Sequence, residues 1–219
     1  MKHKEFWFIY RWIFFALGLF VVIYQCVQIA NNQGQSVVLT TEAAGESDPL
    51  YYWVKFFSYF TIQSNIIGFI VMGFTGWFIL IERQSKTIDI VRLSATTYLT
   101  ITGLVFHTLL VPFGSFIWDF SVFMQHTLLP LMIIFDWLAA PSGSRIKMRD
   151  TLWLLIYPVI YLTYSMVRGA FVHEYPYFFM DPSAISPVMI GVYLLGILGF
   201  GLILANLYRL RMPRPVVSS

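Results

Sequence analysis

Charged residues are scarce in this chain. Only 11% of its 219 residues are Asp, Glu, Lys or Arg, whereas a soluble domain carries about 25% charged residues. Hydrophobic residues make up 58% of the chain and aromatic residues 19%. This composition excludes an ordinary soluble enzyme and indicates an integral membrane protein, and the length leaves room for a single domain.

Cysteine is almost absent, and so are the patterns that hold metals. The single cysteine, Cys26, lies in an apolar run, which excludes an internal disulfide and a cysteine-based metal or redox motif. Two histidines lie within apolar runs, but no carboxylate is well placed beside them, and such a set makes a poor zinc site. We therefore expect neither a metal nor a cofactor.

The sequence contains several long apolar runs. A helix needs about 20 mainly apolar residues to cross a bilayer, and the chain has six such runs. The first begins like a signal peptide, but it is too long and no Ala-x-Ala cleavage site follows, so we expect it to be retained. Because lipid satisfies no backbone polar group, we predict an all-α bundle of six transmembrane helices. The predicted spans are approximately 7–30, 53–81, 90–112, 120–139, 152–170 and 187–208.

The basic residues gather on one side of the predicted spans. Of the 14 Lys and Arg residues, only Lys55 and Arg168 fall on the opposite side. By the positive-inside rule, we expect both termini in the cytoplasm of a multi-pass cell-membrane protein. This distribution also accounts for the net charge of +3 without a nucleic-acid partner. The other basic residues are Lys2, Lys4, Arg11, Arg83, Lys86, Arg92, Arg145, Lys147, Arg149, Arg209, Arg211 and Arg214.

Thr61 and His126 are polar residues inside apolar runs, where polar side chains are costly and functional by default. At 1.5 Å per residue, Thr61 lies ~12 Å and His126 ~10 Å below the outer ends of their helices. His107 and Arg168 reach a similar depth. We therefore expect one polar layer in the outer half of the bilayer.

Polar residues also follow helical spacing. Ser58, Thr61 and Asn65 share one stripe of the second predicted helix, and Ser64 lies beside it. Asp119 shares a face with His126 on the fourth helix. Polar stripes that face a common interior would line a cavity. The stripe on the fifth helix consists of Tyr157, Tyr161, Tyr164 and Arg168.

Each of these residues also has a structural explanation. Thr and Ser in membrane helices often bond the carbonyl four residues earlier or assist packing, and a buried histidine can simply donate to a hydroxyl. His107 and the tyrosines fit an aromatic belt, and Arg168 can extend to the surface. Asp136 is expected to pair near the end of its helix, away from the site.

Three short segments resemble a known family. They are similar to the segments around the threonine and the histidine of the androgen-induced and ADTRP membrane proteins, and to the Tyr-Pro-Phe segment before the last span of that family. The six-span plan agrees, and the basic, proline-rich tail suggests a distant bacterial branch. The three segments are Phe60-Thr61, Gln125-His126-Thr127-Leu128-Leu129-Pro130 and Tyr175-Pro176-Tyr177-Phe178.

The resemblance implies an activity. Members of that family are multi-pass hydrolases that cleave fatty acid esters of hydroxy fatty acids with a threonine nucleophile and a histidine. The resemblance therefore implies that Thr61 is the nucleophile of an intramembrane esterase and that His126 is its general base. The implied substrate is a lipid ester, and the implied surroundings are the lipid bilayer. No buried acid stands at an orienting position, so a dyad fits better than a triad, and Asp119 would contribute only through a neighbouring group or water.

Other polar residues are candidates for supporting roles. Asn65, Ser64, Tyr164 and Arg168 are candidate donors to the oxyanion of an ester intermediate or to the substrate. His107 is a candidate either to orient His126 or to bind the product carboxylate.

Two other functions stay open at this stage. A transporter of a small anion or of protons would use the same histidines and Arg168. Against it stand the lack of an inverted repeat with broken helices and the concentration of polar groups in the outer half without a continuing inner path. A non-enzymatic lipid-binding protein or scaffold would use Thr61 and His126 only to join two helices. No pattern indicates an oligomeric state.

Overall fold

The protein is an all-α bundle, and the computed structural model describes residues 2–31, 49–113, 118–140 and 143–211. Six helices in these segments are long and apolar enough to cross a membrane, which confirms the predicted spans to within a few residues at most boundaries. These six are Lys4–Ala30, Phe60–Leu80, Lys86–Leu110, Phe120–Ala139, Met148–Val172 and Pro187–Arg209.

The six spans are built from shorter elements. The longer helices are α1 (Lys2–Ala30), α4 (Phe60–Leu80), α5 (Lys86–Val105), α8 (Leu129–Ala139), α9 (Ile156–Val172) and α10 (Pro187–Arg209). The shorter ones are α3 (Pro49–Ser58), α6 (Val111–Phe113) and α7 (Phe120–Phe123). Two π-helical turns, η1 (Phe106–Leu110) and η2 (Met124–Leu128), and two 3₁₀ turns, η3 (Met148–Leu155) and η4 (Phe178–Met180), complete the described elements.

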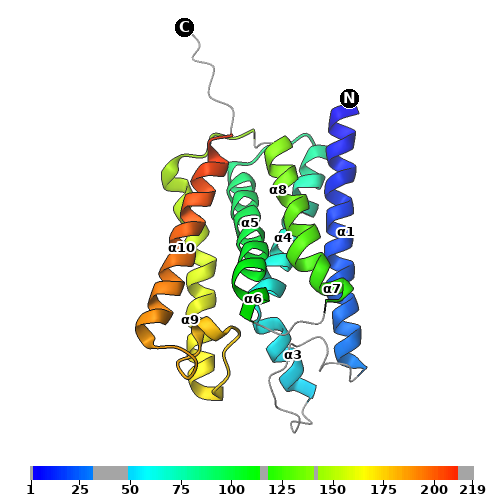
Figure 1. The fold of residues 1–219 in the computed structure, drawn as a ribbon. Coiled ribbons are helices and arrows are strands. Elements are labelled where there is room, and N and C mark those ends of the chain that lie inside the picture. Colours follow the sequence, from blue (N-terminus) through cyan, green and yellow to red (C-terminus); the bar gives the residue numbers. More distant parts are fainter. Residues whose placement is uncertain (1, 32–48, 114–117, 141–142, 212–219) are drawn as a thin grey trace.

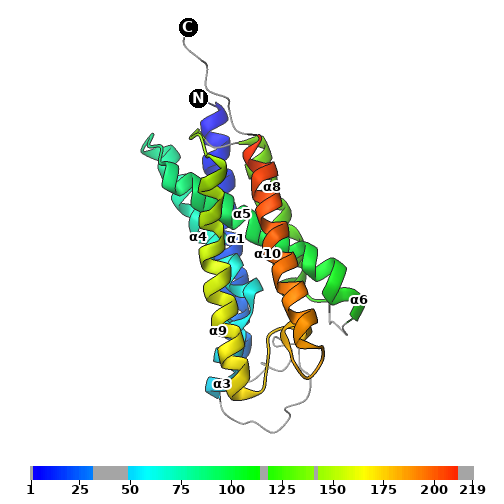
Figure 2. The same ribbon diagram turned by 90° about the vertical axis from the view of Figure 1, so that its left-hand side faces the viewer.

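The helix α5 occupies the middle of the bundle, where it packs against α4, α8 and α10. The helices α9 and α10 form the side opposite α1 (Figure 1), and this side faces the viewer in Figure 2. The first turn of α1 and the last turn of α10 lie at the same end (Figure 1), as an even number of crossings requires. The cytoplasmic location of that end stays a prediction, and the basic tail after Arg211 lies outside the described residues.

Small residues allow α1 and α4 to approach closely. A Cβ on Gly18 would lie 2.6 Å from the Cβ of Phe69, and one on Gly76 would lie 3.2 Å from the ring of Trp12. Tight packing of this kind drives helix association in lipid, where burial of apolar surface gives little gain.

The second predicted span is not one continuous helix. The chain leaves the helical conformation at Tyr59 (φ −76°, ψ 132°), between α3 and α4. Side chains satisfy the carbonyls that the break releases. The Gln63 side chain donates to the Phe57 carbonyl at 2.6 Å, and the Tyr161 hydroxyl donates to the Ser58 carbonyl at 3.1 Å. The continuous helix predicted over 53–81 was therefore wrong, because these side chains replace the missing backbone bonds.

Candidate active site

Thr61 is the second residue of α4, directly after the break at Tyr59. The first amides of a helix have no partner within the helix, and the Thr61 N–H donates to Tyr177 Oη at 3.3 Å. The Thr61 hydroxyl Oγ1 lies 3.3 Å from His126 Nε2 and 3.5 Å from Tyr177 Oη. The two residues that sequence placed at one depth therefore meet, together with a tyrosine from the loop before α10.

His126 is oriented by a backbone carbonyl. Its Nδ1 lies 3.1 Å from the carbonyl oxygen of Val122, and because a carbonyl only accepts, the bond assigns the proton to Nδ1. A neutral ring then presents the lone pair of Nε2 to the Thr61 hydroxyl. The ring of Phe106 stacks on the imidazole, with centroids 3.9 Å apart and an interplanar angle of 24°. The imidazole therefore has a fixed plane and a fixed tautomer.

Both histidines of the membrane layer lie in π-helical turns, His107 in η1 and His126 in η2. Each turn is followed closely by a proline, Pro112 or Pro130. Proline has no N–H to offer the carbonyl four residues earlier, so Pro130 removes the partner of the His126 carbonyl. Such turns occur often at functional sites, since they redirect side chains within a helix.

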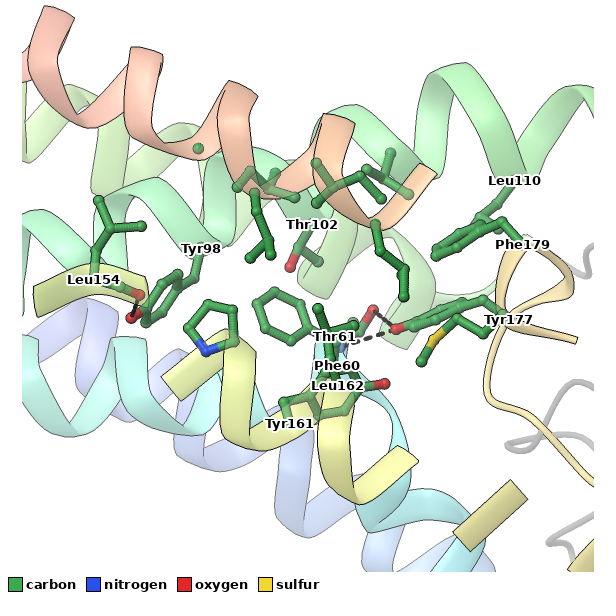
Figure 3. A pocket seen from close by; sticks show the side chains of 18 residues that line it. Phe60, Thr61, Tyr98, Thr102, Leu110, Leu154, Tyr161, Leu162, Tyr177 and Phe179 are labelled. Carbon is green, nitrogen blue, oxygen red and sulfur yellow. Dashed lines mark hydrogen bonds between the residues drawn. The ribbon is translucent and has the colours of Figure 1, made fainter. Parts of the chain in front are cut away.

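An apolar pocket opens at Thr61 (Figure 3). Its walls come from α4, α5, η1, η3, α9, η4, α10 and the loop that carries Tyr177. Figure 3 shows Thr61 between one end near Tyr98 and Leu154 and another near Leu110 and Phe179. His126 is not among the lining residues, so it is linked to the cavity through its contact with Thr61. The lining comprises Phe60, Thr61, Tyr98, Ile101, Thr102, Val105, Leu110, Leu154, Pro158, Tyr161, Leu162, Tyr177, Phe179, Met180, Leu194, Ile197, Leu198 and Gly201.

Asn65 and Ser64 lie behind Thr61 and are not among the residues that line the pocket. The Asn65 amide donates to the Thr61 carbonyl at 2.8 Å and to the Gln125 carbonyl at 3.3 Å. The Ser64 hydroxyl donates to the same Thr61 carbonyl at 3.1 Å and lies 2.9 Å from Thr102 Oγ1. Both side chains thus hold the first turn of α4, and Asn65 joins it to the turn that carries His126.

The other predicted site residues bond elsewhere. Tyr164 Oη lies 3.0 Å from Ser58 Oγ, and His107 Nε2 lies 3.1 Å from Thr127 Oγ1. Asp119 caps α7 by accepting the Val122 N–H at 2.8 Å. Within the described residues, none of these hydrogen bonds reaches the side chain of Thr61 or His126. The structure therefore gives no direct support for His107 or Asp119 as the group that orients the His126 ring.

Arg168 belongs to a cluster that holds the loop after α9 against α3. It donates to Glu174 Oε2 at 3.4 Å, and Lys55 pairs with the other oxygen of Glu174. Tyr51 donates to that carboxylate at 2.8 Å. Burial alone would raise the pKa of Glu174, but the bonds from Lys55 and Tyr51 outweigh it and hold the pKa below its usual value. The two basic residues on this side are therefore paired.

Tyr177 also contacts Thr61, although the sequence predicted no role for it. It stacks on Phe179, with centroids 5.1 Å apart and an interplanar angle of 8°. Burial raises the pKa of the Tyr177 phenol, which keeps it protonated and able to donate. Its signal was the Tyr175-Pro176-Tyr177-Phe178 segment, but a loop position gives no distance to a helix.

A second buried polar layer lies in the other half of the bundle. Asp136 binds two arginines, with Arg11 Nε 2.8 Å from one carboxylate oxygen and Arg92 Nε 2.9 Å from the other. The expected pairing of Asp136 near the end of its helix is confirmed. Its partners Arg11 and Arg92, which were counted only as signals of orientation, are buried in the bundle, so buried polar groups are not concentrated in the outer half alone. Between the layers lie Leu99 of α5 and Ile133 of α8, both 0% exposed.

No known protein family, curated protein or solved structure matches the chain. The likeness to the androgen-induced and ADTRP proteins therefore rests on the three short segments quoted above. In the structure these segments supply Thr61, His126 and Tyr177, whose side chains meet at one point. The described residues contain no group of three or more His, Cys, Asp or Glu that could hold a metal ion.

Proposed function

We propose that the protein is an intramembrane hydrolase of lipid esters, with its site in the outer half of a cell membrane. The observation that carries the proposal is the 3.3 Å contact between Thr61 Oγ1 and His126 Nε2 at an apolar pocket. A hydroxyl within reach of an oriented base is the arrangement of an activated nucleophile. The pocket extends to both sides of Thr61 (Figure 3), which suits an ester with an apolar chain on each side of its carbonyl.

The first half of the reaction forms an acyl-enzyme. His126 Nε2 takes the proton of the Thr61 hydroxyl as Oγ1 attacks the ester carbonyl, and a tetrahedral intermediate forms. The protonated imidazole then gives this proton to the alcohol oxygen, the bond from that oxygen to the carbonyl carbon breaks, and the alcohol leaves. General-base help of this kind contributes about 10²–10⁴-fold to the rate.

Water completes the reaction. It attacks the acyl-threonine while His126 Nε2 accepts its proton, and the proton then returns to Thr61 Oγ1 as the fatty acid leaves. In both halves the Val122 carbonyl keeps the Nδ1 proton in place, so the ring passes a proton at Nε2 alone.

Two donors at Thr61 are placed to stabilise the oxyanion. One is the amide N–H of Thr61 itself, at the positive end of α4. The other is the Tyr177 phenol, 3.5 Å from Oγ1. Donors aimed at developing charge in a water-poor site contribute more than they would in water.

The direct test is covalent trapping. A fluorophosphonate probe should phosphonylate the folded protein, and peptide mapping should place the adduct on Thr61. Absence of labelling, together with lipid esters left intact by protein that is folded, would rule out the hydrolase.

Replacing Tyr177 by phenylalanine should lower kcat about 10²-fold and change KM little, since the lost hydroxyl acts on the oxyanion and not on the bound ester. Steady-state kinetics on a soluble chromogenic ester would measure both constants. Tyr193→Phe is the matched control, because Tyr193 belongs to the same aromatic cluster through Phe179 and is not among the residues that line the pocket at Thr61. Equal rates for the two variants would exclude the oxyanion role of Tyr177.

Gly201 should limit the length of the chain that the pocket admits. A Cβ there would lie 3.1 Å from Ile101 and 3.9 Å from Leu154, at one end of the pocket. We expect Gly201→Val to lower kcat/KM for long acyl chains about tenfold and to spare short ones. Gly199→Val is the control, since a Cβ at Gly199 meets nothing within 4 Å. A uniform loss across chain lengths would contradict this assignment.

A further inference from the structure

A second cavity lies at the end of the bundle that carries the first turn of α1 and the last turn of α10. The first turns of α1 and α5, the last turn of α4 and the residues after α8 enclose it. One part of its wall is apolar and consists of Trp7, Phe78, Ile79 and Ile88. The remainder is mostly charged or polar.

The charged lining has an excess of basic groups. Four basic side chains line the cavity, namely Lys4, Arg11, Arg83 and Arg92, against the acids Glu82 and Asp89. Both acids are engaged.

Glu82 accepts from Lys4 at 2.8 Å, and Asp89 accepts the backbone N–H of Ser144 at 3.2 Å. Asp136 adds a third negative charge behind the lining, which leaves a formal excess of one positive charge. Arg83 has no ion-pair partner among the described residues.

The excess of positive charge comes from the buried part of the cavity wall. Asp136 shares its single negative charge between Arg11 and Arg92, and the three side chains are 0%, 8% and 3% exposed. Backbone carbonyls of Thr75 and Ala140 accept further guanidinium donors, but they bring no net charge. Unbalanced charge in apolar surroundings is costly, so an anion in this cavity would be stabilised.

A phosphodiester fits this cavity best. It carries one negative charge, equal to the formal excess, and guanidinium groups bind phosphate oxygens in pairs. The apolar wall offers a surface to glycerol and the first methylene groups of a lipid. Basic pockets between transmembrane helices on the positively charged side are known to bind anionic headgroups. We propose that this cavity binds the phosphodiester headgroup of an anionic phospholipid from the adjacent leaflet.

This site is separate from Thr61. On α5, α4 and α8 the buried side chains of Leu99, Met72 and Ile133, all 0% exposed, lie between the two layers. Lipid bound here would therefore join α1, α4, α5 and α8 at their basic ends and would not enter the ester pocket. Binding is expected whether or not Thr61 is catalytic.

The test uses the full chain in a neutral detergent with added short-chain phosphatidylglycerol, and it reads the thermal unfolding midpoint as lipid is titrated. Phosphatidylcholine with the same chains and inorganic phosphate are run in parallel. We expect phosphatidylglycerol to raise the midpoint in a saturable way, and the other two to have little effect. Raised salt should weaken the binding.

Arg83→Gln is the informative variant, because Arg83 is exposed and forms no ion pair with another described residue, so its loss should not affect folding. Its apparent affinity for phosphatidylglycerol should fall about fivefold, as expected for one basic residue near an anionic headgroup. Arg149→Gln is the matched control, since Arg149 is exposed on η3 but does not line the cavity. Thr61→Ala should bind the lipid like the wild type.

Three outcomes would overturn the proposal. Equal stabilisation by phosphatidylcholine would show that the negative headgroup is not recognised. Equal weakening in Arg83→Gln and Arg149→Gln would indicate attraction to the whole basic end instead of this cavity. Stabilisation by inorganic phosphate as strong as that by phosphatidylglycerol would assign the cavity to a soluble phosphate and not to a lipid.

Discussion

Thr61→Ala is expected to abolish ester hydrolysis, with a loss of at least about 10⁴-fold in kcat. Alanine removes the attacking oxygen but leaves the Thr61 carbonyl that Ser64 and Asn65 bond, so the first turn of α4 should keep its structure. Thr61→Ser restores a hydroxyl at the same position and should recover much of the activity. Hydrolysis of a lipid ester in detergent, with fluorophosphonate labelling of the same samples, measures both effects.

His126→Ala should lose nearly as much activity as Thr61→Ala, and the double variant should lose little more, because two groups that act in one step are not additive. His107→Ala is the matched control. It also removes an imidazole from the layer, but His107 bonds Thr127 and not the nucleophile, so its rate should stay within a few-fold of the wild type. Fully additive losses for Thr61 and His126 would mean that they act separately.

Asp136→Asn is expected to destabilise the fold by about 3–5 kcal/mol, the usual result of breaking a buried ion pair from one side. The variant keeps the shape of the side chain but leaves Arg11 and Arg92, both nearly inaccessible, without a countercharge. Thermal unfolding in detergent should show the loss, and labelling at Thr61 should survive at temperatures where the variant is folded.

Glu82→Gln is the control for that measurement. It removes the partner of Lys4 in an ion pair whose side chains are 68% and 74% exposed, and exposed pairs contribute little to stability. An Asp136→Asn variant that unfolds at the same temperature as Glu82→Gln would show that the arginines find other partners.

The spans and the meeting of Thr61 with His126 were predictable for a simple physical reason. Both predicted helices start at the same face, so counting residues from that face gives depth directly. Few polar side chains lie at that depth, so few pairs of polar side chains can meet inside the bundle. Depth does not give direction around a helix, however, and this is why Asn65 and Ser64 were placed at the cavity when they lie behind it.

The break at Tyr59 and the two π-turns were not predictable in the same way. No Pro or Gly marks the break in the sequence. The break is stabilised instead by hydrogen bonds from the side chains of Gln63 and Tyr161 to the carbonyls that it releases, and no local pattern predicts these bonds. Pro112 and Pro130 hint at irregular turns, but only the three-dimensional context decides between a kink and a π-turn.

The burial of Arg11 and Arg92 beside one carboxylate was not predictable for a third reason. A count of basic residues per side assigns orientation without asking whether a given arginine is in the loop or in the helix. The partner of both is Asp136, which is 125 residues from Arg11 and 44 from Arg92. No local pattern reports so distant a pairing.

The bond from His126 to the Val122 carbonyl has a consequence for a catalyst inside lipid. A triad with aspartate would keep a permanent negative charge in a medium that solvates ions poorly. A peptide carbonyl also orients the imidazole but is uncharged, so Thr61, His126 and Val122 carry no net charge at rest. Charge would arise only during the reaction, as an imidazolium and an oxyanion side by side, and would vanish when the product forms. The site would therefore need no buried counterion of its own.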